Sequence, residues 1–142
     1  MILEDPLVLR TDRADGLTTL TLNRPGQFNS LSKDMLTALQ AELDAIAGNE
    51  AVRVVLIAGA GKAFCAGHDL KEMRANHSHE YMRDLFRRCG RLMTTMTRMP
   101  QPVIARVHGI ATAAGCQLVA SCDLAVAADV ARFAVSGINV GL

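Results

Sequence analysis

Tryptophan is missing from this 142-residue sequence, and its other aromatic residues are one tyrosine and four phenylalanines. A core built from this composition must be aliphatic, formed by leucine, valine, isoleucine, alanine and methionine. Half of all residues are hydrophobic, which is enough to form a sizeable core. The length is that of one ordinary domain.

An excess of charge of either sign is also lacking, because 15 basic and 14 acidic residues leave a formal net charge of +1. Bulk electrostatics therefore gives no indication of a nucleic-acid or membrane partner. No apolar run reaches the roughly 18 residues that a membrane span needs. The N-terminal residues lack the basic start and long apolar stretch of a signal peptide. We therefore expect a cytoplasmic protein without a nucleic-acid or membrane partner.

The four cysteines do not form a recognisable metal or redox motif. None stands in a CxxC pair, and the histidines do not complete a zinc spacing, so we expect no metal site. We interpret these residues as small core hydrophobes in a reducing compartment. They are Cys65, Cys89, Cys116 and Cys122.

The hydrophobic pattern predicts alternating strands and helices. The expected strands span residues 7–10, 16–22, 52–59, 102–107, 123–127 and 132–135. The expected helices run from Ser32, a plausible N-cap, to near Gly48, from about Asp69, from His79 to about Met99, and over 115–121. This order predicts an α/β fold with mainly parallel pairing. The hairpin at the start of the chain makes a mixed sheet the expected result.

The glycine-rich stretch LIAGAGKAFCAG, residues 56–67, fits neither common nucleotide motif. A phosphate-binding P-loop needs serine or threonine after Gly61–Lys62, where this chain has Ala63. A dinucleotide fingerprint needs a third glycine where this chain has Phe64. Both interpretations fail on these residues.

Two places combine the end of a strand, small residues and the start of a helix. One lies near Gly67 and Asp69, and the other lies between Gly109 and Gly115. Two such turns can direct backbone N–H groups at one point, which is the requirement for an oxyanion hole. The alternative is close packing of helices on strands with no ligand, and composition alone leaves both open.

Three ordered motifs resemble the crotonase family, also called the enoyl-CoA hydratase/isomerase family. They are NRPGQFNSLS, FCAGHDLKEM and PVIARVHGIATAAGCQLVASCDLAVAADVARFA, and the resemblance extends over residues 7–142. It implies a spiral of ββα units, with a mixed, mainly parallel sheet flanked by helices. It also implies that residues 1–142 are the N-terminal part of a single domain, and that the full-length protein forms homotrimers or hexamers.

The same resemblance implies acyl-CoA binding, with the coenzyme A thioester as substrate or ligand and no other cofactor. The expected oxyanion-hole donors are the backbone N–H groups of His68 and Ala114. The coenzyme is expected along the segment that contains Ala66, Gly67, Asp69 and Leu70, with Lys71 near a phosphate. A role in fatty acid metabolism, as a lyase or isomerase, follows from the family.

Both glutamates that hydratases of the family use to activate water are replaced. Gln117 stands at one position and Gly137 at the other. An amide takes no proton near neutral pH, and glycine offers only its backbone, so ordinary hydration is doubtful. Three alternatives stay open: an atypical enzyme that stabilises an enolate, a non-catalytic acyl-CoA binder or regulator, and a true hydratase or isomerase that recruits another acid.

Other polar residues have weaker functional interpretations. The His68 side chain is a candidate substitute acid or base, and Glu72 could reach the mouth of the pocket. We expect His77 and His79 to be exposed and Asp123 to have a structural role. The arginines of the helix from His79 are expected on a solvated face, with phosphate binding as the lesser alternative: Arg83, Arg87, Arg88, Arg91 and Arg98.

Overall fold

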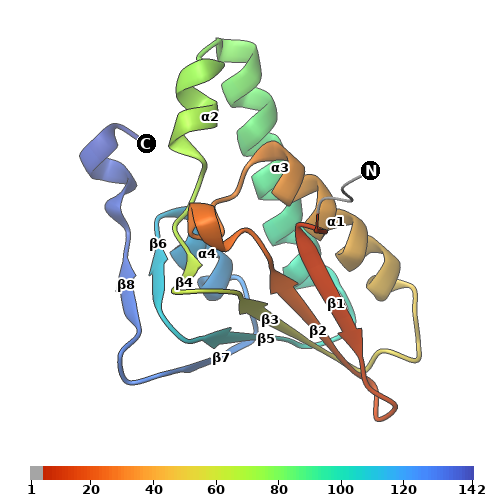
Figure 1. Ribbon diagram of the computed structural model, residues 1–142. Coiled ribbons are helices and arrows are strands. Elements are labelled where there is room, and N and C mark those ends of the chain that lie inside the picture. Colours follow the sequence, from red (N-terminus) through yellow and green to blue (C-terminus); the bar gives the residue numbers. More distant parts are fainter. Residues whose placement is uncertain (1–4) are drawn as a thin grey trace.

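The computed structural model describes residues 5–142 as alternating strands and helices (Figure 1). The strands are β1 (Val8–Asp12), β2 (Leu17–Leu22), β3 (Val54–Gly59), β4 (Ala63–Cys65), β5 (Val103–Val107), β6 (Ile110–Thr112), β7 (Leu124–Ala127) and β8 (Arg132–Ala134). The helices are α1 (Lys33–Ala47), α2 (Leu70–Ala75), α3 (His79–Arg98) and α4 (Ala114–Ala120). Two 3-10 helices span Pro25–Gln27 and Ser136–Val140.

Five strands form a mixed sheet in the order β1-β2-β3-β5-β7. The hairpin partners β1 and β2 are antiparallel, and the other pairs are parallel. This confirms the predicted α/β class and the mixed, mainly parallel sheet. The predicted strand boundaries agree with the structure within about two residues, which is ordinary for such patterns.

The strands β4, β6 and β8 form a second, parallel sheet of three strands that we did not predict. Two of them, β4 and β6, were expected to be loop and small-residue turn. Each has only three residues, too few for hydrophobic alternation to be recognised in a sequence. The chain therefore passes from a strand of the large sheet to a strand of the small sheet before it enters a helix. This gives the ββα unit that the family resemblance implies.

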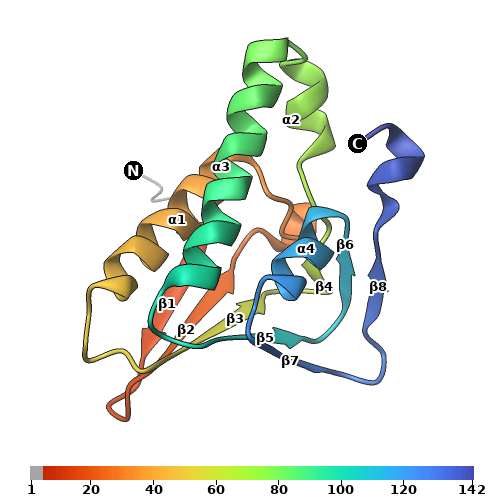
Figure 2. The ribbon, with the colours of Figure 1, turned by 180° about the vertical axis from the view of Figure 1, so that it is seen from behind.

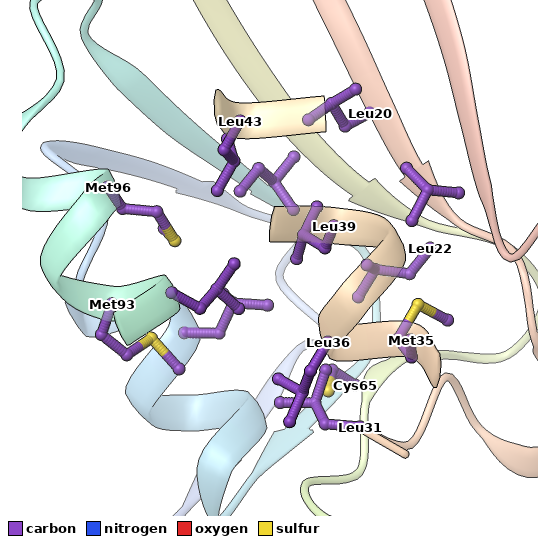
Figure 3. Close-up of a cluster of buried hydrophobic side chains, with 14 of the residues drawn as sticks. Leu20, Leu22, Leu31, Met35, Leu36, Leu39, Leu43, Cys65, Met93 and Met96 are labelled. Carbon is purple, nitrogen blue, oxygen red and sulfur yellow. The ribbon is translucent and has the colours of Figure 1, made fainter. Parts of the chain in front are cut away.

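Helices α1 and α3 pack against each other on one face of the large sheet (Figures 1 and 2). Figure 3 shows α1 between the sheet and α3, so its apolar side chains contact both. Each fully buried leucine of this layer contributes about 1.5–3 kcal/mol relative to an exposed one. The labelled side chains that join the three layers include Leu20, Leu22, Leu39, Leu43, Met93 and Met96.

Helix starts agree with the capping signals in the sequence. The Ser32 side chain accepts a hydrogen bond from the Met35 N–H at 3.1 Å, as predicted for an N-cap. Ser78 caps α3 in the same way through Tyr81 N–H. Exposed arginines occupy the outer face of α3, where Arg88 pairs with Asp84 and Arg91 with Asp44. The solvated-face interpretation of this set is confirmed.

The strands β7 and β8 and the residues that follow differ from this packed region. Their large apolar side chains are exposed, with Leu124 at 64%, Val135 at 78% and Ile138 at 80% of full exposure. Residues 135–142, which we call the terminal arm, extend beyond β8 beside α2 (Figure 2). Over the described residues, no helix is both long and apolar enough to cross a membrane.

Candidate functional site

The first turn of the site connects β4 to α2 through Ala66–Asp69. Gly67 has a φ of +92°, which residues with a side chain rarely adopt. Asp69 is the N-cap of α2 and accepts hydrogen bonds from the N–H groups of Lys71 and Glu72, both at 3.1 Å. The Asp69 carboxylate also pairs with Arg24 at 2.7 Å. The predicted start of this helix near Asp69 is confirmed, and the cap fixes where the chain turns.

The loop over residues 23–30 holds this turn from the other side. Asn29 is fully buried, and its side-chain amide donates to the carbonyls of Ala60 and Ala63, both at 2.9 Å. The Ala66 N–H then donates to Phe28, and the Leu31 N–H donates to the Gly67 carbonyl. Hydrogen bonds from the NRPGQFNS motif and from Leu31 therefore hold the first turn in place.

The second turn connects β6 to α4 through Ala113. This residue has φ 51° and ψ −124°, and its side chain makes no capping hydrogen bond. A positive φ at an alanine is uncommon and is found mostly where the surrounding structure imposes it. The Ala113 N–H donates to the Ala134 carbonyl of β8 at 2.8 Å. The helix then begins at Ala114, whose own N–H points out of the first helical turn.

The two turns touch each other through their backbones. A Cβ atom at Gly67 would lie 3.3 Å from the Ala114 nitrogen, and one at Gly115 would lie 2.1 Å from the Cys65 carbonyl oxygen. Within residues 5–142, neither the His68 N–H nor the Ala114 N–H donates to a hydrogen-bond acceptor. Over these residues, two amide donors without a partner therefore lie on adjoining turns.

A pocket of about 680 Å³ opens in front of these turns, between α3, α4 and the terminal arm. Its lining is mainly apolar and contains no acidic side chain among the described residues. Most of the site residues predicted from sequence lie on it: Ala66, His68, Leu70, Ala114, Gln117 and Gly137. The structure thus brings α3, α4, the two turns and the arm to a single cavity of the size that small-molecule sites have.

The His68 side chain lies in the pocket wall, half-buried, edge-on to the Phe86 ring at 5.2 Å between centroids. Burial lowers the pKa of this imidazole below its ordinary value of 6.5, and the Leu31 backbone and the Glu72 carboxylate oppose the change only in part. The ring is therefore neutral at physiological pH. Gln117 is exposed on α4, one helical turn beyond Ala113, and offers an amide to the same space.

Three predicted coenzyme-binding residues do not line this pocket. Gly67 is buried in the turn, Asp69 is engaged as a cap, and Lys71 is exposed beside a different, polar hollow that also includes Arg24. Glu72 does not reach the pocket mouth either. Its carboxylate accepts a hydrogen bond from the Tyr81 hydroxyl at 2.5 Å and so ties α2 to α3.

The remaining polar candidates are placed as expected. His77 and His79 are exposed. The Asp123 carboxylate accepts a hydrogen bond from the Val103 N–H at 2.7 Å, which joins the start of β7 to the start of β5. The cysteines Cys65 and Cys89 are buried, and the structure pairs none of the four in a disulfide.

Several pocket residues were not recognised as such in the sequence, among them three on α3 and α4. Phe86 follows the apolar periodicity of α3, which alone indicates a buried position, yet it is 44% exposed and lines the cavity. Gly90 and Cys116 also line it. Only Gly90 carried a signal, because glycine is an unfavourable residue for the middle of a long helix.

Comparisons with known proteins identify the family. The enoyl-CoA hydratase/isomerase family profile matches residues 12–142. Enoyl-CoA hydratase domain-containing protein 3, mitochondrial, of Xenopus laevis is 48% identical over 127 residues, 89% of this chain and 43% of that protein. The rat protein of the same name is 41% identical over 97% of this chain and 46% of its own length. The chain therefore spans less than half the length of these relatives.

Solved structures show the same fold. An enoyl-CoA hydratase of Mycobacterium smegmatis is 63% identical, with a TM-score of 0.95 over 97% of this chain and 54% of that one. Human enoyl coenzyme A hydratase domain-containing protein 3 is 42% identical, with a TM-score of 0.90 over 96% of this chain and 53% of that one.

The predicted cytoplasmic location is contradicted by these comparisons, because several similar relatives are named as mitochondrial proteins. The physical reason is that a balanced charge and reduced thiols describe a folded domain equally well in both compartments. Location is directed by targeting segments that are separate from the fold. The fold class and the family resemblance, in contrast, are confirmed, and on the match over residues 12–142 the chain belongs to the enoyl-CoA hydratase/isomerase family.

Proposed function

We propose that the pocket binds an acyl-CoA thioester, with the thioester carbonyl oxygen between the N–H groups of His68 and Ala114. The observation that carries this proposal is the contact of the two turns, in which the Gly67 Cβ position lies 3.3 Å from the Ala114 nitrogen. The apolar lining suits an acyl chain. Membership of the family supports the same class of ligand.

Such a pair of donors stabilises negative charge on the oxygen when the thioester forms an enolate. One donor of this kind contributes about 3–4 kcal/mol to a transition state. The neighbouring backbone groups are already held by the loop over residues 23–30, so the donors need little rearrangement when a ligand arrives. Stabilisation of the enolate oxygen therefore needs only backbone atoms of this chain. Forming the enolate also needs a base that takes the α-proton, or a nucleophile that adds to the double bond.

We propose further that ordinary hydration is weak. The resemblance implies glutamates at the positions of Gln117 and Gly137, and no acidic side chain lines the pocket among residues 5–142. Each lost acid or base typically reduces a rate by about 10²–10⁴-fold. The neutral His68 ring also lies in the pocket wall and can accept a proton there, and burial holds its pKa below the ordinary value of 6.5.

The coenzyme itself is proposed to follow the backbone from Ala66 to Leu70, since both of these residues line the pocket. Lys71 lies next to this segment with its side chain exposed, and we propose that it approaches a coenzyme phosphate. A lysine in such a place acts as a point charge, so its contribution should fall as salt is added.

A second candidate function is acyl-CoA binding without catalysis. It is favoured by one observation: the pocket offers amide donors and apolar surface but no carboxylate in the described residues. A protein of this kind would sequester or sense thioesters. Both candidates share the same binding site, and turnover separates them.

The test compares the wild-type protein with Gln117→Glu, using crotonyl-CoA. We expect both proteins to bind the thioester, measured by thermal shift, and the wild type to hydrate it slowly. Restoring one carboxylate should raise the hydration rate by roughly tenfold or more. Gln117→Asn is the control, because it keeps an amide at this position.

Rapid hydration by the wild type would contradict the proposed weak hydration and indicate another acid. Binding with no turnover of any thioester by either protein would favour the non-catalytic candidate. The absence of a thermal shift with every acyl-CoA would overturn the proposal as a whole.

A further inference from the structure

Gly90 stands in the interior of α3, a helix of 20 residues. Glycine is about 1 kcal/mol less favourable than alanine at such a position, since it has more backbone freedom to lose. Its presence in an otherwise regular amphipathic helix therefore calls for a physical reason at this position.

Close packing does not supply that reason. A Cβ atom at Gly90 would meet no atom within 4 Å. Elsewhere in the chain, glycines are fixed by contact, since a Cβ at Gly59 would lie 2.6 Å from the Phe64 oxygen and one at Gly109 would lie 2.4 Å from the Lys62 oxygen. Gly90 differs from these because it borders open space, and that space is the pocket.

The position of Gly90 relative to the proposed oxyanion hole follows from α3. The Phe86 ring lies 5.2 Å from the His68 ring, so this part of the helix adjoins the first turn of the site. Gly90 comes one helical turn later, about 6 Å further along the axis. Both residues line the pocket, and Ala120 of α4 lines it as well. The cavity thus continues from the donors past Phe86 towards Gly90.

We propose that Gly90 determines the length of acyl chain that the pocket accepts. This inference rests on the proposed function, because the occupant is the acyl part of the same thioester. Carbons next to the thioester lie beside His68 and Phe86 and do not reach Gly90. Carbons further along the chain pass over Gly90, where a side chain would occupy their space.

Gly90→Leu tests the proposal, with acetyl-CoA, hexanoyl-CoA and dodecanoyl-CoA as probes and the Kd of each measured by calorimetry. We expect the variant to bind dodecanoyl-CoA about tenfold more weakly or worse, since one methylene group in an apolar pocket already changes discrimination by about that factor. Acetyl-CoA should bind with an unchanged Kd. Gly90→Ala should shift dodecanoyl-CoA binding in the same direction by less, and its melting temperature should rise.

Thr94→Leu is the matched control. It adds a leucine at another exposed position of α3 that is not part of the pocket lining, so no Kd should change. Equal binding of dodecanoyl-CoA by wild type, Gly90→Ala and Gly90→Leu would overturn the inference while leaving the proposed function intact. A wild-type protein that binds none of the three thioesters would overturn both.

Discussion

The turn after β4 and the turn after β6 are equivalent in the fold. Each leads from a short strand into a helix and offers one free N–H group. Different interactions hold them. The first is fixed by side chains: Asp69 caps α2 and pairs with Arg24, and Asn29 braces the loop behind it. The second has no capping side chain and is fixed mainly by backbone contact, through Gly115 against Cys65, with one side-chain hydrogen bond from the Thr112 hydroxyl to the Ala66 carbonyl at 3.1 Å.

This difference determines how each turn responds to mutation. A turn held by side chains loses stability in steps, because each hydrogen bond can be removed by itself. A turn held by backbone contact has no room for an added atom, so one methyl group displaces a whole helix. The second turn should therefore be the more sensitive of the two.

Gly115→Ala should have the largest effect. Its Cβ would lie 2.1 Å from the Cys65 carbonyl oxygen, so α4 must move away from β4 and carry the Ala114 N–H with it. Overpacking of this kind costs about 3 kcal/mol. We expect a loss of this size in urea unfolding and a loss of the thermal shift with crotonyl-CoA.

Gly48→Ala is the control for that experiment. A Cβ at Gly48 would meet nothing within 4 Å, so the free energy of unfolding should change by about 0.5 kcal/mol at most. If Gly115→Ala were as stable as Gly48→Ala and still bound the thioester, the contact between α4 and β4 would not be what positions the second donor.

Asp69→Ala should have the next largest effect, because it removes the cap of α2 and the partner of Arg24. The expected loss is about 1–2 kcal/mol, the range for helix caps. Asp69→Asn keeps a capping oxygen without the charge, so it should lose less. Unfolding in urea at pH 7 measures the free energy of unfolding of the wild type and of both variants. Equal stability of the alanine variant and the wild type would show that the first turn does not depend on its cap.

The same carboxylate predicts a dependence on pH. Burial raises the pKa of Asp69, but the hydrogen bonds from Glu72 N–H and from Arg24 outweigh it, so the folded pKa lies below the ordinary value of 3.8. The unfolded state then binds the proton first as the pH falls. The stabilisation is complete above about pH 4–5 and disappears as the pH falls through the folded pKa. In Asp69→Asn this acid-dependent part should be absent.

The first turn could largely be predicted from sequence because side-chain signals mark it. Asp69 precedes an acidic helix start, and Gly67 permits a positive φ. The second turn could be placed only within a few residues, and the strand β6 before it was missed. The signals that determine it are contacts between carbonyl oxygens and glycines far apart in the sequence, and no local pattern reports them.

The two sheets differ in the same way, because the large sheet could be predicted from the sequence and the small sheet could not. Strands such as β3 are apolar enough to be recognised alone, and α1 and α3 carry clear apolar faces. The small sheet consists of strands of three residues each, which pair because the turns bring them together. The place of Phe86 and Gly90 in the pocket wall depends on how α3 lies relative to α4 and the turns, which no local pattern in the sequence reports.

Ala113→Gly should have the smallest effect and should improve stability. Ala113 holds φ 51° and ψ −124°, which costs a residue with a side chain about 1–3 kcal/mol. Glycine relieves this strain but loses about 0.5–1 kcal/mol through the greater freedom of the unfolded chain. We expect a net gain of about 1 kcal/mol in urea unfolding. Ala113→Val is the opposite control, since a β-branched residue tolerates positive φ poorly and should destabilise the protein. If glycine lowered stability instead, the Ala113 methyl group would contribute a packing contact against the first turn. Side-chain contacts would then stabilise both turns, and the difference between them would be smaller than the hydrogen bonds indicate.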